Sequence, residues 1–362
     1  MRVKLKDITK FSKGTQINGK NLIDDGAYSY LNGGINPSGK WNEFNVAENT
    51  VTISEGGNSS GYVNYMNEAF WCGAHCYYLY DGPKNSKYLY YALKSQQERL
   101  FRIRSGACMP NIKKSDLGNF IIEYEEDETR QEEVVKVLEK CELLIEDYNK
   151  KLALLDEAVR ARFVEMFGDP VVNDKKWKIR YFSDLGGLKR GKSKHRPRND
   201  PILLGGKYPL IQTGDVTNSN TYIKSYTSTY SEEGLKQSKM WKKGTLCITI
   251  AANIAESAIL TFDACFPDSV VGFTPNGEVI SLFIHYWLSF LQPILEENAP
   301  AVAQKNLNVA TLEKVGVIVP PLELQNQFAS FVEEVDKSRS RIQKSLEASQ
   351  ELFDSLMQEY FG

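Results

Sequence analysis

Histidine is scarce in this chain of 362 residues, and its three copies are too far apart in the sequence to suggest a catalytic group. His75, His195 and His285 fit neither a Ser-His-Asp nor a Cys-His pattern. Cys72 and Cys76 flank His75, but no second Cys/His pair follows at a spacing that would complete the four ligands of a structural zinc ion. We therefore expect packed thiols at this position and no metal.

Regularly spaced cysteines and long apolar runs are also missing. Six cysteines without regular spacing do not predict a disulfide framework in a chain of this length, which favours a reducing compartment. The longest apolar run, residues 280–295, carries His285, Gln292 and Pro293 and is too short to span a bilayer. The first residues, MRVKLKDITKF, lack the apolar core of a signal peptide. These features predict a cytosolic protein that does not contact membranes.

Catalytic motifs are either absent or out of context. Residues 186–193 match the phosphate-loop pattern GxxxxGK[ST], which works only between a buried strand and a helix. The residues that follow, KHRPRNDP, cannot form a regular helix. Neither an Asp/Asn-Pro-Pro-aromatic methylase loop nor a Pro-Asp…Glu-x-Lys nuclease core is present. The chain is predicted to bind rather than to react, and the alternative is a phosphate-loop NTPase or a nuclease that acts on DNA in its own right.

Charge is unevenly distributed along the chain, although the total is close to neutral. The 44 Lys and Arg residues against 46 Asp and Glu residues give a net charge of −2. Residues 171–243 contain sixteen basic and six acidic residues, whereas residues 126–166 contain seven basic and twelve acidic residues. A basic, loop-rich segment with Tyr, Asn, Gln and Ser is typical of a surface that contacts phosphates and reads base edges. The alternative is a solvated loop without a ligand.

An internal duplication organises the chain. When the sequence is displaced by 194 or 195 residues, it aligns with itself without gaps over two long blocks. The alignment pairs Thr50 with Thr245 and Asn58 with Asn253, and it places EMFG of the first copy over EYFG of the second. Near the start of each copy the displacement shrinks to 177, so the second copy has a longer early loop. The chain is therefore interpreted as two copies of one unit.

Each copy is predicted to combine a globular part with a long helix. Short strands are expected at residues 50–54 and 245–250, which are rich in β-branched side chains. A helix is expected late in each globular part, at residues 88–102 and 282–296. The predicted fold class is α+β, with globular domains at residues 1–125 and 169–319 and long helices at residues 126–168 and 320–362.

The two long helices carry a heptad pattern. In the first, apolar residues recur in alternating steps of four and three, at Val134, Leu138, Cys141, Ile145, Tyr148, Leu152, Leu155 and Val159. The second continues from Phe328 to Leu356 with Arg339 and Ser349 as polar interruptions, and the Pro-Pro pair at residues 320–321 marks its start. Because neither helix can bury its stripe alone, we expect an antiparallel coiled coil that relates the globular parts by a pseudo-two-fold axis. The alternative is that each stripe packs on its own globular domain.

Four short motifs follow one another in this duplicated frame. They are MFGDP at residues 166–170, RGKS at residues 190–193, QKNL at residues 304–307 and VPPLELQNQF at residues 319–328. In this order they resemble the DNA specificity (S) subunit of type I restriction-modification systems, over essentially the whole chain. The first copy departs from the pattern, since YEED at residues 124–127 stands where the second copy has its Pro-Pro junction.

This resemblance implies that each globular part is a target recognition domain for one half of a bipartite site in double-stranded DNA. It implies that the long helices are a spacer and the docking surface for two adenine methylase subunits, with restriction subunits completing the complex. The chain itself would be non-catalytic and would hold no cofactor, whereas S-adenosylmethionine, ATP and Mg would bind to partner subunits, which flip the adenine. The implied location is the prokaryotic cytoplasm.

The candidate DNA contacts are polar side chains in loops rich in glycine and amides. Arg and Lys suit guanine or phosphate, and Asn and Gln suit adenine. The candidates are Lys13, Thr15, Gln16, Asn58 and Ser59 in the first globular part, and Arg190, Lys192, Ser193, Arg196, Gln212, Asn253 and Lys305 in the second. Ordinary loop polarity is the alternative for each of them.

Overall fold

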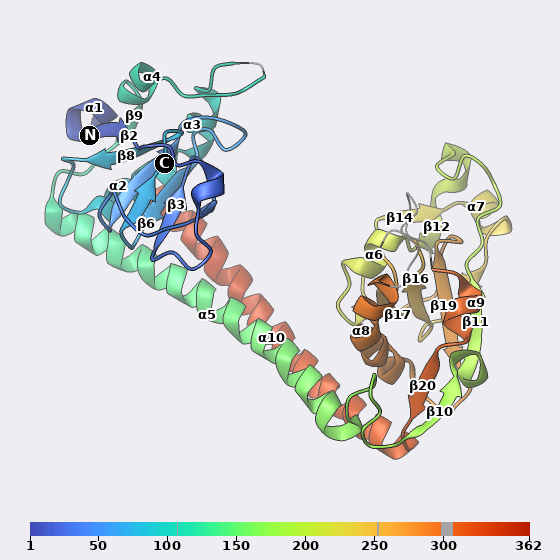
Figure 1. The fold of residues 1–362 in the computed structure, drawn as a ribbon. Coiled ribbons are helices and arrows are strands. Elements are labelled where there is room, and N and C mark those ends of the chain that lie inside the picture. Colours follow the sequence, from blue (N-terminus) through green and yellow to red (C-terminus); the bar gives the residue numbers. More distant parts are fainter. Residues whose placement is uncertain (107, 252, 298–306) are drawn as a thin grey trace. The chain divides into compact units, whose positions relative to one another are not determined.

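The computed structural model describes residues 1–106, 108–251, 253–297 and 307–362 (Figure 1). Two long helices, α5 (Glu128–Phe167) and α10 (Leu322–Phe361), contain 40 residues each. The chain forms two compact units, and each unit takes part of both helices. The first unit is Met1–Lys150 with Ile342–Gly362, and the second is Lys151–Arg341.

The first unit builds its globular part from small antiparallel sheets in which one strand pair is parallel. The sheets have the strand orders β2-β8-β5-β6, β4-β3-β7 and β1-β9. Strand β5 contains four consecutive β-branched residues, Thr-Val-Thr-Ile, before its final serine, and β-branched residues favour the extended conformation. The elements are β1 (Arg2–Lys4), α1 (Leu5–Ile8), β2 (Lys10–Lys13), η1 (Gly19–Asn21), β3 (Tyr28–Leu31), β4 (Gly39–Trp41), β5 (Thr50–Ser54), β6 (Val63–Met66), β7 (Phe70–Cys72), β8 (Cys76–Tyr80), α2 (Ser86–Lys94), α3 (Gln97–Arg102), α4 (Lys114–Gly118) and β9 (Ile121–Glu123).

The second unit repeats this plan with longer connections. Its sheets have the strand orders β11-β19-β16-β17-β13, β14-β12-β18-β15 and β10-β20. The elements are β10 (Lys178–Tyr181), η2 (Phe182–Leu185), β11 (Gly186–Arg190), η3 (Pro201–Leu203), β12 (Leu204–Leu210), α6 (Thr213–Thr217), β13 (Tyr222–Ile223), β14 (Ser228–Tyr230), α7 (Glu232–Lys236), β15 (Met240–Trp241), β16 (Leu246–Thr249), β17 (Ser257–Leu260), β18 (Ala264–Cys265), β19 (Val270–Pro275), α8 (Ser281–Glu297), α9 (Val309–Glu313) and β20 (Gly316–Val319).

The strand orders confirm the duplication that the sequence predicts. The order β2-β8-β5-β6 in the first unit corresponds to β11-β19-β16-β17 in the second. The pair β1-β9 corresponds to β10-β20, and the parallel pair β3-β7 corresponds to β12-β18. Helix α2 packs against β5 and β6, and α8 packs against β16 and β17. The predicted α+β class is therefore confirmed, and the corresponding elements follow one another in the same order, although the second copy has additional short elements such as α6, β13, α7 and β15.

The long helices pack against each other within each unit. In the second unit, the rings of Phe163 on α5 and Phe328 on α10 lie 5.4 Å apart. In the first unit, Leu138 of α5 belongs to the same buried cluster as Met357 of α10. The end of α5 thus meets the start of α10, and the start of α5 meets the end of α10, so the pairing is antiparallel. The stripes also contact their globular parts, since Phe163 stacks on Phe283 of α8.

A buried glutamine anchors each long helix at its first turn. Gln131 is 2% exposed, and its Nε2 donates to the Glu125 carbonyl oxygen at 2.6 Å. Gln325 is fully buried, and its Nε2 donates to the carbonyl oxygens of Pro320 at 2.9 Å and Glu278 at 3.1 Å. These glutamines occupy equivalent places in the two copies. Each one fixes the direction in which its helix leaves the globular part.

One predicted helix is divided in two. The sequence predicts a single helix over residues 88–102, whereas the structure has α2 ending at Lys94 and α3 starting at Gln97. Tertiary contacts interrupt the helix at this point. Gln97 donates from Nε2 to the Gly61 carbonyl oxygen at 2.7 Å, and its Oε1 accepts from the Val63 N–H at 3.0 Å. The equivalent prediction in the second copy, residues 282–296, agrees with α8.

Candidate nucleic-acid interface

A parallel strand pair gives each unit a sheet edge at which several loops meet. In the first unit β3 and β7 run in parallel, with Leu31 opposite Cys72. In the second unit β12 and β18 run in parallel, with Leu210 opposite Cys265. Parallel strands end on the same side of a sheet, so the loops that follow them emerge together. We call residues 32–33 and 73–75 the first edge, and residues 211–212 and 266–268 the second edge.

The first edge brings together three of the predicted contact residues. The backbone N–H of Thr15 donates to the Cys72 carbonyl oxygen at 2.9 Å. The Ser59 hydroxyl donates to the Gly33 carbonyl oxygen at 2.5 Å. Lys13, the last residue of β2, reaches the same region. The loops that sequence reasoning selected therefore converge in space, although they are more than 40 residues apart.

A carboxylate that the sequence did not single out holds Lys13 in place. The Lys13 Nζ donates to Glu55 Oε1 at 2.7 Å, and His75 Nδ1 lies 3.5 Å from Glu55 Oε2. The Glu55 side chain is only 15% exposed. Its position next to a Gly-Gly-Asn-Ser-Ser loop was the available signal. The ionic contact sets the direction of the lysine at the first edge.

The two remaining candidates of the first unit are held differently. Gln16 Nε2 donates to the carbonyl oxygen of its neighbour Ile17 at 3.1 Å. The Asn58 carbonyl oxygen accepts from Arg104 NH1 at 3.2 Å. Both Gln16 and Asn58 are exposed. Arg104 thus joins this surface as a basic residue that sequence reasoning missed.

The basic loop of the second unit, residues 190–200, lies against the second edge. The Gly191 N–H donates to the Val270 carbonyl oxygen at 2.9 Å, and the Lys192 N–H donates to the Phe266 carbonyl oxygen at 3.2 Å. A Cβ on Gly191 would lie 2.2 Å from the Phe266 carbonyl oxygen, so only glycine fits. Residues 186–190 form strand β11, and residues 191–200 follow as bends and turns. The segment lacks the strand-loop-helix context that a phosphate loop requires.

Three basic side chains of this loop contact carboxylates. Asp268, in the turn after β18, accepts from Arg196 NH2 at 3.5 Å and also from Arg198 NH2. His195 Nε2 lies 2.9 Å from Asp200 Oδ2. The N–H of Ile202, followed by this histidine, holds the pKa of the Asp200 carboxyl below its usual range. Arg196 is the member of this group that sequence reasoning chose as a DNA contact; Arg198, Asp268, His195 and Asp200 were not chosen.

The other predicted residues of the basic loop differ in exposure. Arg190, Lys192 and Arg196 are exposed. Ser193 is 6% exposed, and its hydroxyl is enclosed without a hydrogen-bond partner. The structure therefore does not present the Ser193 hydroxyl to a ligand at the surface, because the loop folds over it. This differs from the sequence-based expectation of a direct contact.

Gln212 and Asn253 lie at the two ends of the short helix α6. Gln212 caps the start of α6 together with Asp215, and its Nε2 donates to the Ser228 hydroxyl at 3.1 Å. Asn253 Nδ2 donates to the hydroxyl of Thr217, the last residue of α6, at 3.3 Å. Gln212 belongs to the second edge directly. Lys305, the last candidate, lies outside the described residues.

The cysteines near the first edge are packed, as the sequence predicts. Cys72 and Cys76 are at most 1% exposed, and the Cys72 thiol donates to the Cys76 carbonyl oxygen at 3.5 Å. The contact with Cys76, followed by burial, raises the pKa of the Cys72 thiol. Across the part of the chain that the structure describes, no three His, Cys, Asp or Glu side chains gather in a way that would hold a metal ion.

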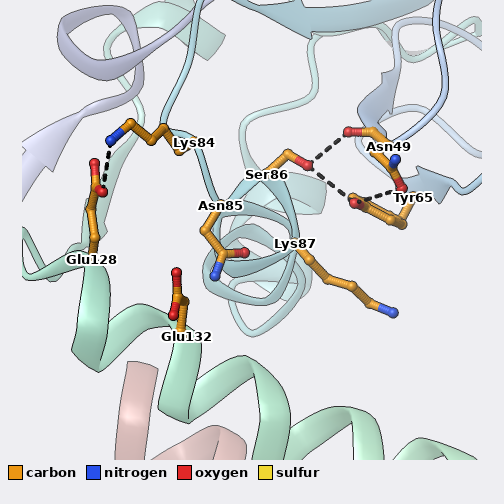
Figure 2. Close-up of a pocket in the computed structure, with 8 residues that line it drawn as sticks. All are labelled: Asn49, Tyr65, Lys84, Asn85, Ser86, Lys87, Glu128 and Glu132. Atoms are coloured by element: carbon orange, nitrogen blue, oxygen red, sulfur yellow. Dashed lines mark hydrogen bonds and ion pairs between the residues drawn. The ribbon is translucent and has the colours of Figure 1, made fainter.

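A pocket of about 330 Å³ in the first unit lies away from the first edge (Figure 2). Figure 2 shows Lys84 joined to Glu128 of α5 at 3.0 Å, and Ser86 bonded to Asn49 and Tyr65 at the start of α2. The Lys84–Glu128 ion pair connects the globular part to α5, and the Ser86 contacts connect α2 to the neighbouring Asn49 and Tyr65. We therefore interpret the pocket as part of the structural contact between the globular part and α5.

The second unit contains a buried Ser-His contact that the sequence spacing did not reveal. Ser257 on β17 and His285 on α8 lie 3.1 Å apart, between Oγ and Nδ1. Both residues are less than 9% exposed, so the contact is part of the core. Burial lowers the pKa of His285 to about 4, which keeps the ring neutral.

Among the described residues, no helix is long and apolar enough to cross a bilayer.

Comparison with known proteins gives a consistent result. The chain matches the family described as type I restriction modification DNA specificity domain over residues 1–156 and 174–350. It is 26% identical over 382 residues to a protein named as a type I specificity subunit in Mycoplasma genitalium, covering 96% of this chain and 90% of the relative. A protein named as a type I specificity subunit in Mycoplasma pneumoniae is 36% identical over 149 residues, which is 40% of each chain.

The fold of the chain is also similar to that of a solved structure. The crystal structure of the type I restriction-modification system S subunit from M. genitalium covers 100% of this chain and 96% of its own, with a TM-score of 0.67 and 20% sequence identity. At this identity the similarity supports the fold, including the two copies and the two long helices.

Proposed function

Because the chain belongs to the type I restriction-modification DNA specificity family, we propose that its two edges read the two halves of a split DNA site. The chain is then the specificity subunit, which recognises DNA and directs the chemistry of partner subunits. The observation that carries the proposal is that the family match covers two segments, residues 1–156 and 174–350, on two units whose strand orders correspond.

The charges at both edges support this function. Lys13 and Arg104 lie near the first edge, and Arg190, Lys192 and Arg196 lie in the basic loop at the second edge. Basic side chains contribute affinity through phosphates, and Arg also reads guanine in the major groove. Amide side chains such as Gln212 stand beside them and suit adenine. Each edge thus combines groups for phosphate contact with groups for base reading.

The partners follow from the same proposal. We expect two adenine methylase subunits to dock on the paired helices and to carry S-adenosylmethionine, and we expect restriction subunits to supply ATP- and Mg-dependent cleavage. Each helix of 40 residues is about 60 Å long at 1.5 Å per residue. We propose that this length sets the gap between the two half-sites, in the cytoplasm of a prokaryotic cell.

The experiment that tests the proposal is a map of methylated adenine in host DNA by single-molecule sequencing. The host is compared with a deletion of this chain and with the deletion complemented by the unaltered chain. We expect a gapped, two-part motif that disappears on deletion and returns on complementation. If the methylases are expressed and the set of methylated motifs is the same in all three strains, the proposal is wrong.

A second test measures the contribution of one basic residue. Arg196→Ala should weaken DNA binding by the assembled complex and reduce the slope of log affinity against log salt by about 1, because one phosphate contact is lost. Lys178→Ala, which removes one charge from the exposed surface of β10 outside the second edge and outside the paired helices, is the matched control. Equal effects of both substitutions would place Arg196 outside the interface.

A further inference from the structure

One carboxylate at the second edge holds two arginines of the basic loop. Asp268 Oδ2 lies 3.5 Å from Arg196 NH2, and Asp268 Oδ1 accepts from Arg198 NH2. Both guanidinium groups remain accessible, since the side chains of Arg196 and Arg198 are 54% and 47% exposed. Without this carboxylate, the two positively charged guanidinium groups would repel each other. The carboxylate therefore gathers two cations at one place while leaving them open to a ligand.

The carboxylate itself is fixed to the sheet. Asp268 lies in the turn between β18 and β19, which is closed by a hydrogen bond from the Val270 N–H to the Pro267 carbonyl oxygen at 3.0 Å. The Asp268 side chain is 34% exposed. The turn also accepts the Lys192 N–H through Phe266 at 3.2 Å. The arginines thus connect to the sheet through a short, hydrogen-bonded segment.

The backbone beneath the arginines is held from a second side. Gln237 Oε1 accepts from the N–H groups of Lys194 at 2.6 Å and His195 at 3.1 Å. The Ser238 hydroxyl donates to the Lys192 carbonyl oxygen at 2.9 Å. Arg196 NH1 also donates to the Ser193 carbonyl oxygen at 2.5 Å. Both the loop and the side chains are therefore ordered before any ligand arrives.

Stability does not account for this arrangement. Ion pairs between exposed side chains contribute little to folding, because water screens them and ordering long side chains costs entropy. The same ordering is useful in recognition, where each flexible side chain that is fixed beforehand no longer has to be fixed on binding. Arg198 uses one nitrogen for Asp268, and a guanidinium carries five N–H groups, so donors remain for DNA.

The first edge contains a corresponding contact. Glu55, with its side chain 15% exposed, holds Lys13 at 2.7 Å and faces His75 at 3.5 Å. The residues and their places in the fold differ from those of the second edge, but here too a carboxylate directs a basic side chain, in this case Lys13 at the end of β2. A carboxylate that directs a basic side chain is thus found beside the edge in each unit, at positions that the duplication does not align.

We propose that Asp268 is a positioning residue for DNA recognition: it presets the guanidinium groups of Arg196 and Arg198 against the half-site that the second unit reads. The inference rests on the proposed function. The expected ligand is a guanine edge or adjacent phosphates, which two neighbouring guanidinium groups fit. Asp268 acts through the arginines and makes no contact with DNA itself.

The test compares Asp268→Asn with Asp263→Asn in the complex with the methylases, by the same methylation map. Asp263 lies at the other end of β18 and pairs with Lys242 at 2.7 Å, so its substitution changes the net charge equally without touching the arginines. We expect Asp268→Asn to reduce the preference for the correct base about tenfold at one or more positions of one half-site. The reason is that the two arginine side chains would then lose their conformational entropy on binding rather than beforehand. The other half-site should stay strict, and Asp263→Asn should leave the motif unchanged.

Each outcome bears on the proposal. Recovery of the strict motif by Asp268→Glu supports positioning, because the charge is restored. If Asp268→Asn yields a motif as strict as that of the unaltered chain, the proposal is overturned. It is also overturned if Asp263→Asn relaxes the motif as much as Asp268→Asn does, because the effect would then come from net charge. A stricter motif would mean that Asp268 competes with DNA, which also overturns it. If Asp268→Asn abolishes methylation altogether, Arg198→Lys keeps the charge and must relax the same half-site.

The proposed function can fail separately from this inference. If the unaltered chain yields no gapped motif, the specificity function is wrong, and the positioning role, which rests on it, is wrong as well. If the unaltered chain yields the motif and the Asp268 variants do not relax it, only the positioning role is wrong.

Discussion

Acid should destabilise the second unit, because that unit keeps a neutral histidine in its core. His285 on α8 is 8% exposed, and burial lowers its pKa to about 4. An unfolded histidine has a pKa of about 6.5. Between these values the unfolded chain binds a proton that the folded chain does not. The stability that depends on the neutral ring is therefore complete above pH 6.5 and is lost as the pH falls toward 4.

The size of the effect follows from the two pKa values. At pH 5 the unfolded histidine is almost fully protonated and the folded one is mostly neutral, so stability falls by about 2 kcal/mol relative to pH 8. At pH values below 4 the loss approaches its limit of roughly 3 kcal/mol, at about 1.4 kcal/mol for each unit of pKa difference. Both figures are differences between pH values and do not depend on the absolute stability.

The assay is urea unfolding at pH 8 and pH 5 for the unaltered chain and for His285→Gln, with hydrogen exchange of the α8 amides as a local measure. The unaltered chain should lose about 2 kcal/mol more than His285→Gln, because other titrating groups cancel in the difference. Ser257→Ala keeps the ring buried and should retain the full pH dependence. If His285→Gln loses as much stability as the unaltered chain between the two pH values, the reasoning is refuted.

Three further substitutions test the packing and charge of the second unit. Phe163→Ala should cost about 3–5 kcal/mol in urea unfolding, because Phe163 is fully buried, whereas Val164→Ala on the exposed face should change stability by less than about 0.5 kcal/mol. Burial raises the pKa of Asp336, so its charge opposes folding more as the pH rises. Asp336→Asn should thus gain more stability, relative to the unaltered chain, at pH 7 than at pH 3.5, and an equal gain at both would contradict this. Gly191→Ala should destabilise by about 1–3 kcal/mol and increase hydrogen exchange in the basic loop, since its Cβ would meet the Phe266 carbonyl oxygen; unchanged exchange would show that the loop accommodates the methyl group.

The helix pairing could be predicted because its physical basis is local and periodic. A spacing of four and three places Val134, Leu138 and Cys141 on one face, and all three are buried in the structure. The polar interruption at Arg339 also has an explanation, because its NH2 lies 2.6 Å from Asp156 Oδ1 on the facing helix. The heptad pattern predicted which face of each helix meets the other helix, and the Asp156 carboxylate on α5 pairs with the arginine that interrupts this pattern in α10.

The division of the predicted helix at residues 88–102 could not be derived in this way. No Pro or Gly interrupts these residues, and their Ala, Leu, Lys, Gln, Glu and Arg residues favour a helix. The break at Ser95 and Gln96 arises because Gln97 bonds to β6 and because Gln96 Nε2 reaches the Phe361 carbonyl oxygen at 2.9 Å. Phe361 is 265 residues away, so no local pattern contains this information.

The candidate site was predictable in its loops but not in its contacts. Composition pointed to Lys13 and Arg196, because basic residues in glycine-rich loops are typical of nucleic-acid surfaces. The carboxylates that hold them, Glu55 and Asp268, lie 42 and 72 residues away along the chain. They reach their partners through the antiparallel pairing of distant strands, since β2 and β5 both pair with β8, and β11 pairs with β19. Strand pairing of this kind depends on the whole domain, which explains why both acids were missed.

The two edges share a backbone but not a set of side chains, and this difference bears on the DNA that they read. The buried Gln131 and Gln325 occupy equivalent places in both copies. The edges, by contrast, carry different side chains: Lys13 lies at the first edge, whereas two arginines and Asp268 lie at the second. If edge side chains select bases, unlike edges must select unlike half-sites. We therefore expect the two halves of the methylated motif to differ in sequence. A motif whose halves are reverse complements would show that the edge residues named here do not choose the bases.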